Sequence, residues 1–278
     1  MVRARTVVGR HVVPACFALL FVAPLVFMVL GSLRPPGLPP PVGVEVVPPD
    51  PTLESYRRVS ALFPDGGRTY LLNSMLVVGV AVPLTVLVAS LAGFGIRLLP
   101  PRSRRRAVVL TLVLLLIPVT AVWATRFQLF RMAGLVGTYV PLIAPALAAT
   151  NPFYVLIYAW AFAQVPEDQL DAARLEGASA ISLWRRVALP QVRAATLAVT
   201  VLAFTFHWSN FIDPLLYLHR IDQYTLPLGA RFLQQFNPTD WPLMLAGAVV
   251  LTLPVIAAVL LAQRLLFDDP RRILRRTV

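Results

Sequence analysis

Residues 70–98 read YLLNSMLVVGVAVPLTVLVASLAGFGIRL, an apolar stretch whose only charged residue, Arg97, lies near its end. A helix of about 20 apolar residues is long enough to cross the hydrocarbon core of a bilayer, so this stretch predicts a membrane-spanning helix. Pro83 lies inside the stretch, which a membrane helix tolerates because neighbouring groups can bond the carbonyl that proline leaves without a donor.

Similar apolar stretches recur on both sides of this one. They predict a single transmembrane domain over residues 1–278 with six spans, at about residues 12–33, 70–98, 107–125, 136–162, 192–218 and 243–266. Three prolines interrupt the fourth span, which should therefore be kinked or broken. The first span resembles a secretory signal, but its length and the five further spans favour an uncleaved helix. We therefore expect an all-α integral membrane fold.

The composition agrees with this class and limits the chemistry. The chain is 58% hydrophobic, and all 25 of its basic residues are arginines. Without lysine it can form neither a Walker A P-loop nor a Schiff base. We therefore expect no cofactor bound by this chain, and any ATP would be handled by a partner. The single Cys16 provides no disulfide framework, and no metal site is implied.

The distribution of the arginines predicts the orientation of the chain in the membrane. Six spans put both termini on one side, and that side carries the larger share of the arginines. By the positive-inside rule both termini are cytoplasmic, and the proline-rich loop 34–68 is external. Because the arginines lie beside apolar spans, they indicate a lipid bilayer and no nucleic acid. The expected location is a bacterial-type plasma (inner) membrane, crossed several times.

The interval between the fourth and fifth spans contains the most informative segment, PEDQLDAARLEGASAISLWRRVALPQVRAA at residues 166–195. Pro166 suits a first helical position, with Glu167, Asp168 and Asp171 near the positive end of that helix. Gly177 can end it in a left-handed conformation, and Pro190 should stop a second helix whose apolar residues Ile181, Trp184 and Val187 recur every three positions.

This segment therefore predicts two short helices on the cytoplasmic surface. Ala172 and Ala173 keep one face thin, so another protein could approach closely. The alternative is an amphipathic linker that rests on lipid headgroups.

Spacing within the segment carries a family resemblance. Asp171-Ala172-Ala173, Gly177 and Val187-Ala188-Leu189-Pro190 follow the pattern E-A-A-x3-G-x9-I-x-L-P. This resembles the EAA signature of ABC importer permeases, with Asp for Glu and Val for Ile as conservative departures. Residues 175–179, 208–211, 224–229 and 239–242 look like those of carbohydrate-type permeases such as the maltose-system inner subunit. The resemblance covers about residues 12–266, and the tail 268–272 departs from it.

The resemblance implies a six-span type I ABC importer permease fold with a cytoplasmic coupling helix in segment 166–191. It assigns docking on the ATPase to Asp171, Ala172, Ala173 and Gly177, and it implies that Leu189-Pro190 fixes the exit into the fifth span. The implied partners are a second homologous permease, two ATPase subunits and an external solute-binding protein. The implied substrate is a sugar, oligosaccharide or related polyol, and the chain alone is not an enzyme.

Asp213 is the only acidic residue within a predicted span. On a helix Asn210, Asp213 and Tyr217 share a face, and their amide, carboxylate and ring suit the hydroxyls and apolar faces of a sugar. The alternative is that Asp213 is an interfacial carboxylate hydrated from outside. His207 is expected to pack within the helix bundle, and Asn73 to bond between helices or line the pathway.

Two other functional classes stay open. An ion-coupled secondary carrier normally needs membrane-embedded carboxylates, and Asp213 is a single candidate. An intramembrane enzyme would need paired catalytic groups, and the sequence contains neither H-E-x-x-H nor G-x-S-x-G.

Overall fold

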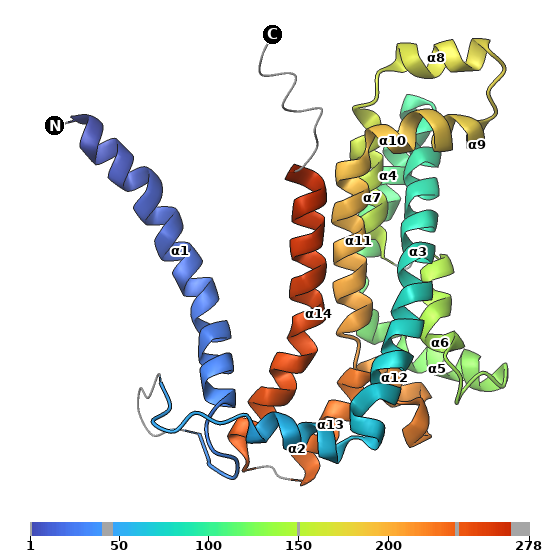
Figure 1. Cartoon of the computed structure of the whole chain (residues 1–278). Helices are drawn as coiled ribbons and strands as arrows, with labels where there is room; N and C mark the ends of the chain where they lie inside the picture. Colours follow the sequence, from blue (N-terminus) through green and yellow to red (C-terminus); the bar gives the residue numbers. More distant parts are fainter. Residues whose placement is uncertain (1, 41–46, 149–150, 237–238, 268–278) are drawn as a thin grey trace. The chain divides into compact units, whose positions relative to one another are not determined.

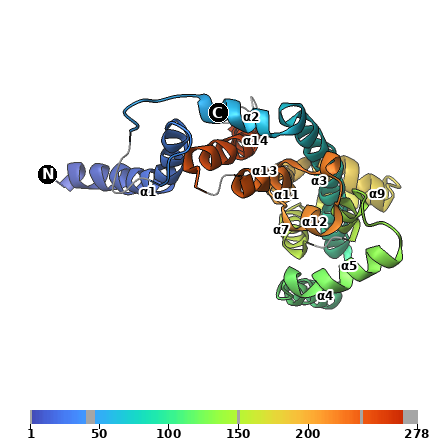
Figure 2. The ribbon, with the colours of Figure 1, turned by 90° about the horizontal axis from the view of Figure 1, so that it is seen from below.

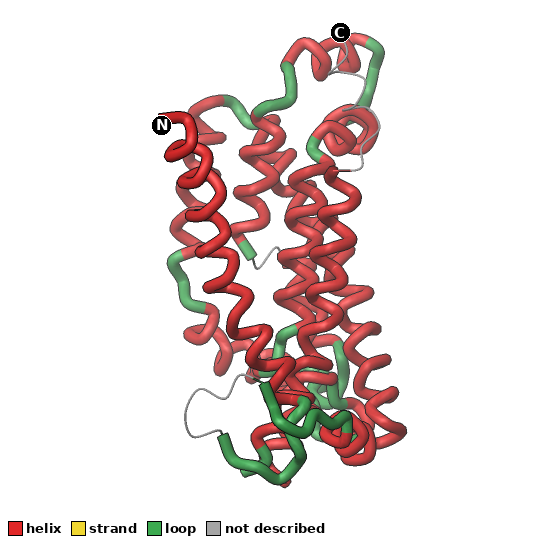
Figure 3. The backbone as a smooth tube through the Cα atoms, turned by 60° about the vertical axis from the view of Figure 1, so that its left-hand side comes forward, coloured by secondary structure: helices red, strands yellow, loops and turns green. Residues whose placement is uncertain are grey.

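The structure of the chain is a computed structural model that describes residues 2–40, 47–148, 151–236 and 239–267. These residues form helices, turns and loops, and the described part of the chain contains no strand (Figure 3). The all-α expectation is therefore confirmed.

Long helices alternate with short ones along the chain (Figure 1). The α-helices are α1 Val2–Ser32, α2 Glu54–Leu62, α3 Arg68–Leu98, α4 Pro101–Leu115, α5 Trp123–Met132, α6 Val140–Ile143, α7 Pro152–Ala163, α8 Glu167–Leu175, α9 Ala180–Ser182, α10 Leu189–Gln191, α11 Arg193–Trp208, α12 Ile212–Tyr217, α13 Leu226–Phe236 and α14 Trp241–Phe267. The 3₁₀ turns are η1 Pro64–Gly67, η2 Val119–Val122, η3 Ala144–Ala148 and η5 Ile221–Gln223, and η4 Leu183–Ala188 is π-helical.

Four segments are long and apolar enough to cross a membrane: Pro14–Ser32, Asp65–Leu98, Val140–Ala163 and Trp241–Leu265. Two further pairs pass the same test but are sharply bent. Pro101–Leu115 and Val119–Met132 meet at 80°, and Ala180–Gln191 and Arg193–Trp208 meet at 87°. Within the described residues there are therefore four candidate spans, or up to six if each bent pair is one span.

The third and fifth predicted spans differ from the structure because proline ends their helices early. In the third, α4 stops at Leu115, three residues before Pro118, and the chain turns into η2. In the fifth, α11 stops at Trp208 and α12 begins at Ile212. Pro214 has no N–H to donate to the carbonyl of Asn210, which weakens a continuous helix over 192–218 at the position where the structure breaks it.

The fourth predicted span is likewise divided, into α6, η3 and α7. Asn151 is the N-cap of α7, and Pro152 occupies its first turn, where a missing N–H costs least.

The helices group into two compact units, residues 1–69 with 226–254 and residues 70–225 with 255–278. In the first unit, the end of α1 is joined to the segment that follows it. Ser32 Oγ lies 2.6 Å from the Tyr56 hydroxyl, and the Thr52 amide donates to the Leu33 carbonyl at 2.7 Å.

In the second unit, α7 packs against both α4 and α11 and lies between them when viewed along the helices (Figure 2). The α3 helix approaches α7 closely at Gly93, where a Cβ would lie 2.5 Å from the Tyr158 side chain. Phe94 and Phe162 pack edge to face at 5.3 Å. The unit carries α8, α9 and α10 at one end of these helices and α5, α6 and α12 at the other (Figure 1).

Candidate functional site

The segment with the permease-like motif lies at one end of the second unit (Figure 1). The α8 helix begins at Glu167, one residue after Pro166, which is its N-cap and not its first helical residue. The helix ends in a Schellman motif: the Gly177 amide donates to the Arg174 carbonyl at 2.9 Å, and the Ala178 amide to the Ala173 carbonyl at 3.0 Å. Gly177 has a φ of +81°, so its predicted left-handed conformation is confirmed.

The second helix of the segment differs from its prediction. Pro190 does not stop it, because helical structure continues through α10 to Gln191 and the turn comes at Val192. The six residues of η4 are π-helical, so the regular hydrogen-bond ladder is already interrupted before Pro190.

The same π-helical turns change which residues are buried. Leu183 and Ala188 are buried, whereas Ile181, from the predicted apolar row, is 69% exposed. Leu170 is the buried residue of α8, and Leu175 at its end is 91% exposed. The segment therefore presents two large apolar side chains, Leu175 and Ile181, on either side of the Gly177 turn.

The motif residues lie mostly on the surface of this segment. Asp171, Ala172, Gly177 and Pro190 are exposed, and Ala173 and Leu189 are partly buried. A partner could therefore reach the Asp171-Ala172 face directly.

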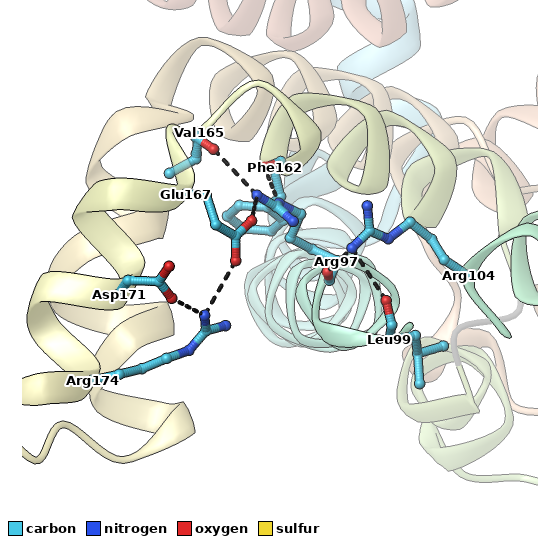
Figure 4. Close-up of polar contacts among 8 residues, drawn as sticks. All are labelled: Arg97, Leu99, Arg104, Phe162, Val165, Glu167, Asp171 and Arg174. Atoms are coloured by element: carbon cyan, nitrogen blue, oxygen red, sulfur yellow. Dashed lines mark hydrogen bonds and ion pairs between the residues drawn. The ribbon is translucent and has the colours of Figure 1, made fainter. Parts of the chain in front are cut away.

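Ion pairs run along α8 from its first residue (Figure 4). Arg174 donates to Glu167 at 3.1 Å and to Asp171 at 2.5 Å, and Glu167 also pairs with Arg97. Hydrogen bonds from Arg97 and Arg174 hold the pKa of the Glu167 carboxyl below its ordinary value. Hydrogen bonds that Arg174 donates to the carboxylates of Asp171 and Glu167 raise the pKa of Arg174. The start of α8 is therefore charged and cross-linked at neutral pH.

The predicted pathway residues Asn210, Asp213 and Tyr217 do come together at the other end of the unit, around Arg126. Arg126 Nη2 pairs with the Asp213 carboxylate, and its Nε donates to the Tyr217 hydroxyl at 3.3 Å. Asp213 is only 9% exposed, so the interpretation of a carboxylate hydrated from outside is wrong.

The shared helical face is also wrong in part, since Asn210 precedes α12. Its Oδ1 accepts from the Asp213 amide at 3.2 Å, and its Nδ2 donates to the Asp213 carboxylate at 2.8 Å. The Tyr217 ring is fully buried, between Phe127 at 5.8 Å and Phe130 at 5.5 Å. In this conformation Asn210 bonds Asp213, Arg126 links Asp213 to Tyr217, and the Tyr217 ring is already buried.

A small cavity adjoins this cluster. It is lined by Ser74, Val77, Leu142, His207, Trp208, Asn210, Pro214 and Thr225. Its volume of about 10 Å³ accepts roughly one water molecule and is too small for a sugar ring. His207 Nε2 lies 3.1 Å from Thr85 Oγ1, which agrees with a packing role in the bundle. Asn73 donates to the carbonyls of Asp222 and Tyr224 at 2.9 and 3.0 Å, so it joins α3 to the loop before α13.

The sequence analysis did not predict that Arg97 and Arg126 form ion pairs, because it considered the arginines only for the orientation of the chain in the membrane. A usable signal existed for both. Arg97 lies within the last turn of an apolar span, and Arg126 follows another, where an unpaired guanidinium is costly and a carboxylate partner is expected.

Comparisons with known proteins show which family this chain belongs to. A model of the family "Binding-protein-dependent transport system inner membrane component" matches residues 70–271. The arabinooligosaccharides transport system permease protein AraQ of Halalkalibacterium halodurans is 28% identical over 252 residues, 90% of this chain and 89% of the relative. The trehalose/maltose transport system permease protein MalG of Thermococcus litoralis is 27% identical over 252 residues, 89% and 88% of the two chains.

A solved structure shows the same fold. A chain of a bacterial ABC transporter involved in the import of the acidic polysaccharide alginate superposes with a TM-score of 0.72 at 18% identity, covering 94% of this chain and 96% of that one. This chain is accordingly a multi-pass membrane transport subunit and not an enzyme, with ATP hydrolysis carried out by a separate subunit. It belongs to the family of inner membrane components of binding-protein-dependent transport systems.

Proposed function

We propose that this chain forms half of the translocation pathway of an ABC importer for a sugar, oligosaccharide or related polyol. An external solute-binding protein would deliver the solute, a second homologous permease would complete the pathway, and two ATPase subunits would drive it with ATP and Mg²⁺. The permease relatives are named for arabinooligosaccharides and for trehalose/maltose, which supports a sugar.

The observation that carries the proposal is the geometry of segment 166–191. Two short helices joined by the Gly177 turn lie outside the long apolar helices, with Leu175 and Ile181 exposed beside the turn. Apolar side chains this exposed cost free energy in water, and a protein cleft that accepts them would recover it. This supports docking on the ATPase through Asp171, Ala172, Ala173 and Gly177, with Leu189 and Pro190 at the exit toward α11.

ATP-driven closure of the two ATPase subunits would then move this segment as a lever. The proposal requires the segment on the cytoplasmic side, where the positive-inside rule also predicts both termini.

Asn210, Asp213 and Tyr217 are our candidates for contact with the solute. Their polar atoms are paired with one another and with Arg126 in this conformation. We therefore propose that they exchange these partners for sugar hydroxyls only when the pathway opens.

Reconstitution of the chain with its partner subunits in proteoliposomes tests the function. Maltose, trehalose and an arabinooligosaccharide serve as labelled solutes, and an ATPase subunit mutated at its own P-loop lysine serves as the control. We expect uptake of at least one sugar that requires ATP, the binding protein and the intact ATPase. Uptake that persists without the ATPase would support an ion-coupled carrier and refute the proposal.

A charge-removal series tests the candidate solute contacts. Asp213→Asn alone leaves Arg126 without its carboxylate, whereas Asp213→Asn with Arg126→Gln removes both charges. Loss of one partner of a buried ion pair typically costs about 3–5 kcal/mol, so we expect the double variant to recover the folded yield of the wild type. If it also recovers wild-type sugar uptake, Asp213 has a structural role and no contact with the solute.

A further inference from the structure

Arg97 joins three parts of the second unit at the end where the motif segment lies (Figure 4). It belongs to the last turn of α3 and is only 9% exposed. Its Nε donates to the Phe162 carbonyl at 3.2 Å, and its Nη2 lies 3.5 Å from the Val165 carbonyl and pairs with the Glu167 carboxylate. One guanidinium therefore contacts the last turn of α7, the link that follows it and the first residue of α8.

Each of these contacts has a physical reason. Phe162 lies in the last turn of α7, where carbonyls lack helical donors and the helix dipole favours a cation. Glu167 lies at the start of α8, where the dipole favours an anion. The guanidinium is planar with a fork of N–H donors, so it can serve these acceptors at the same time.

The side chains of these ion pairs differ in how far they are exposed to solvent. The side chain of Arg97 is 9% exposed, whereas those of Glu167, Arg174 and Asp171 are 48%, 39% and 56% exposed. Exposed pairs contribute little, because solvent screens them and ordering the side chains costs entropy. A buried guanidinium that loses its carboxylate is left with an uncompensated charge. The Arg97–Glu167 pair is therefore the link that holds α8, and Arg174 is an accessory to it.

The α8 helix packs against η4 of the same segment, and the Arg97–Glu167 pair ties it to α3. The helix has nine residues, and Leu170 is its single buried residue. A nine-residue helix is marginal by itself and depends on such contacts. At the other side of Arg97, Arg104 donates to the carbonyls of Arg97 and Leu99 at 2.8 and 3.1 Å, which joins the end of α3 to the start of α4.

We propose that Arg97 is a positioning residue for energy coupling: through Glu167 it locks α8 to α3 and α7, so that the three helices move together when the ATPase displaces α8. This inference rests on the proposed docking of α8 on an ATPase. It predicts that breaking the pair leaves α8 able to move without carrying α3.

A distance measurement in the assembled transporter tests the lock. With Cys16 replaced by Ser, nitroxide labels are placed at Leu91→Cys on α3 and Gln169→Cys on α8, both exposed positions outside the ion pairs and the motif residues. Distances between the labels are measured with and without ATP and vanadate. We expect one narrow distribution in the wild type, unchanged by nucleotide. In Glu167→Gln the share of molecules outside that range should rise at least about fivefold with nucleotide, the lower end of a typical coupling effect.

Matched variants keep the test decisive. Arg174→Gln removes only the exposed pairs and should retain the wild-type distribution. Arg97→Gln should behave like Glu167→Gln, and if it fails to fold, Glu167→Gln still decides because its side chain is isosteric and half exposed. A lowered melting temperature with an unchanged distance distribution in Glu167→Gln would show a purely structural role and overturn the inference.

An effect of Arg174→Gln as large as that of Glu167→Gln would also overturn it. Failure of the wild-type chain to bind any ATPase subunit would instead refute the proposed function.

Discussion

Gly177 allows a sharp prediction, because backbone strain and steric bulk rank the Ala and Asn substitutions at this position in opposite order. Its φ is +81°, and a Cβ built on it would meet no atom within 4 Å. A side chain there therefore meets no obstacle within the chain, and the cost is the local strain of a left-handed residue, about 1–2 kcal/mol. Asn adopts this conformation more readily than Ala or Val.

If strain decides, Gly177→Asn should stay near the wild type and Gly177→Val should be worst. A cost of about 1–2 kcal/mol changes the population of the capped turn by roughly 5- to 30-fold, so Gly177→Ala should weaken binding of the ATPase by about that factor. The assay is the affinity of the purified permease in lipid nanodiscs for its ATPase subunit. Asn is larger than Ala, so an Asn variant weaker than the Ala variant would refute the strain argument and indicate a close contact with the partner.

Gly134 provides the matched control. It ends α5 with a φ of +68° and the same Schellman bonds, from Gly134 to Arg131 at 3.0 Å and from Leu135 to Phe130 at 2.9 Å, and a Cβ there meets nothing within 4 Å. Gly134→Ala carries the same local strain away from the motif segment. It should therefore leave ATPase affinity unchanged.

Three further predictions concern stability and pH. Gly93→Ala should destabilise the chain by about 1–3 kcal/mol and lower its melting temperature in detergent, because the new Cβ would lie 2.9 Å from a backbone nitrogen of α7. Gly95→Ala on the same helix is the control: its Cβ meets nothing within 4 Å, so the melting temperature should not change. Thr85→Val should cost about 1–3 kcal/mol by leaving buried His207 without its bond, and an unchanged melting temperature would exclude that bond. The pKa of Glu167 is lowered in the folded chain, so the ion pairs of its carboxylate contribute fully to stability above the ordinary pKa of 4.5. This contribution is lost only as pH falls through the lower folded pKa. The distance distribution between labelled α3 and α8 should therefore be constant from about pH 6 to about pH 8.

The sequence predicts the class of fold because lipid leaves few choices for an apolar stretch of this length. It predicts helix ends less well where prolines cluster. The α4 helix ends at Leu115, before Pro118, and α11 ends at Trp208, before Pro214. Hydropathy alone does not predict either end, because apolar residues continue past the break. Pro190 shows the opposite case, in which π-helical turns let helical structure continue through a proline.

The motif and the Gly177 turn are local in sequence, so they are predictable from it. The ion pairs are not, since Arg97 and Glu167 are 70 residues apart and Arg126 and Asp213 are 87 apart. Their pairing depends on which helices become neighbours, and composition does not determine that. A local pattern predicts Asp213 as a carboxylate beside Asn210, but only the structure shows that Arg126 neutralises it.

The Arg97–Glu167 and Arg126–Asp213 pairs explain why arginine suits these two positions better than lysine would. Arg97 serves two carbonyls and a carboxylate at once, and Arg126 serves a carboxylate and the Tyr217 hydroxyl. An ammonium is a compact point charge on a flexible stem and cannot hold acceptors in a planar fork. Arg97→Lys would keep the charge beside Glu167 and lose contacts with α7. In this variant α3 and α8 would still attract each other through charge but would no longer be held in a fixed orientation. Comparing Arg97→Lys with Arg97→Gln therefore separates the effect of the charge from the effect of the guanidinium geometry.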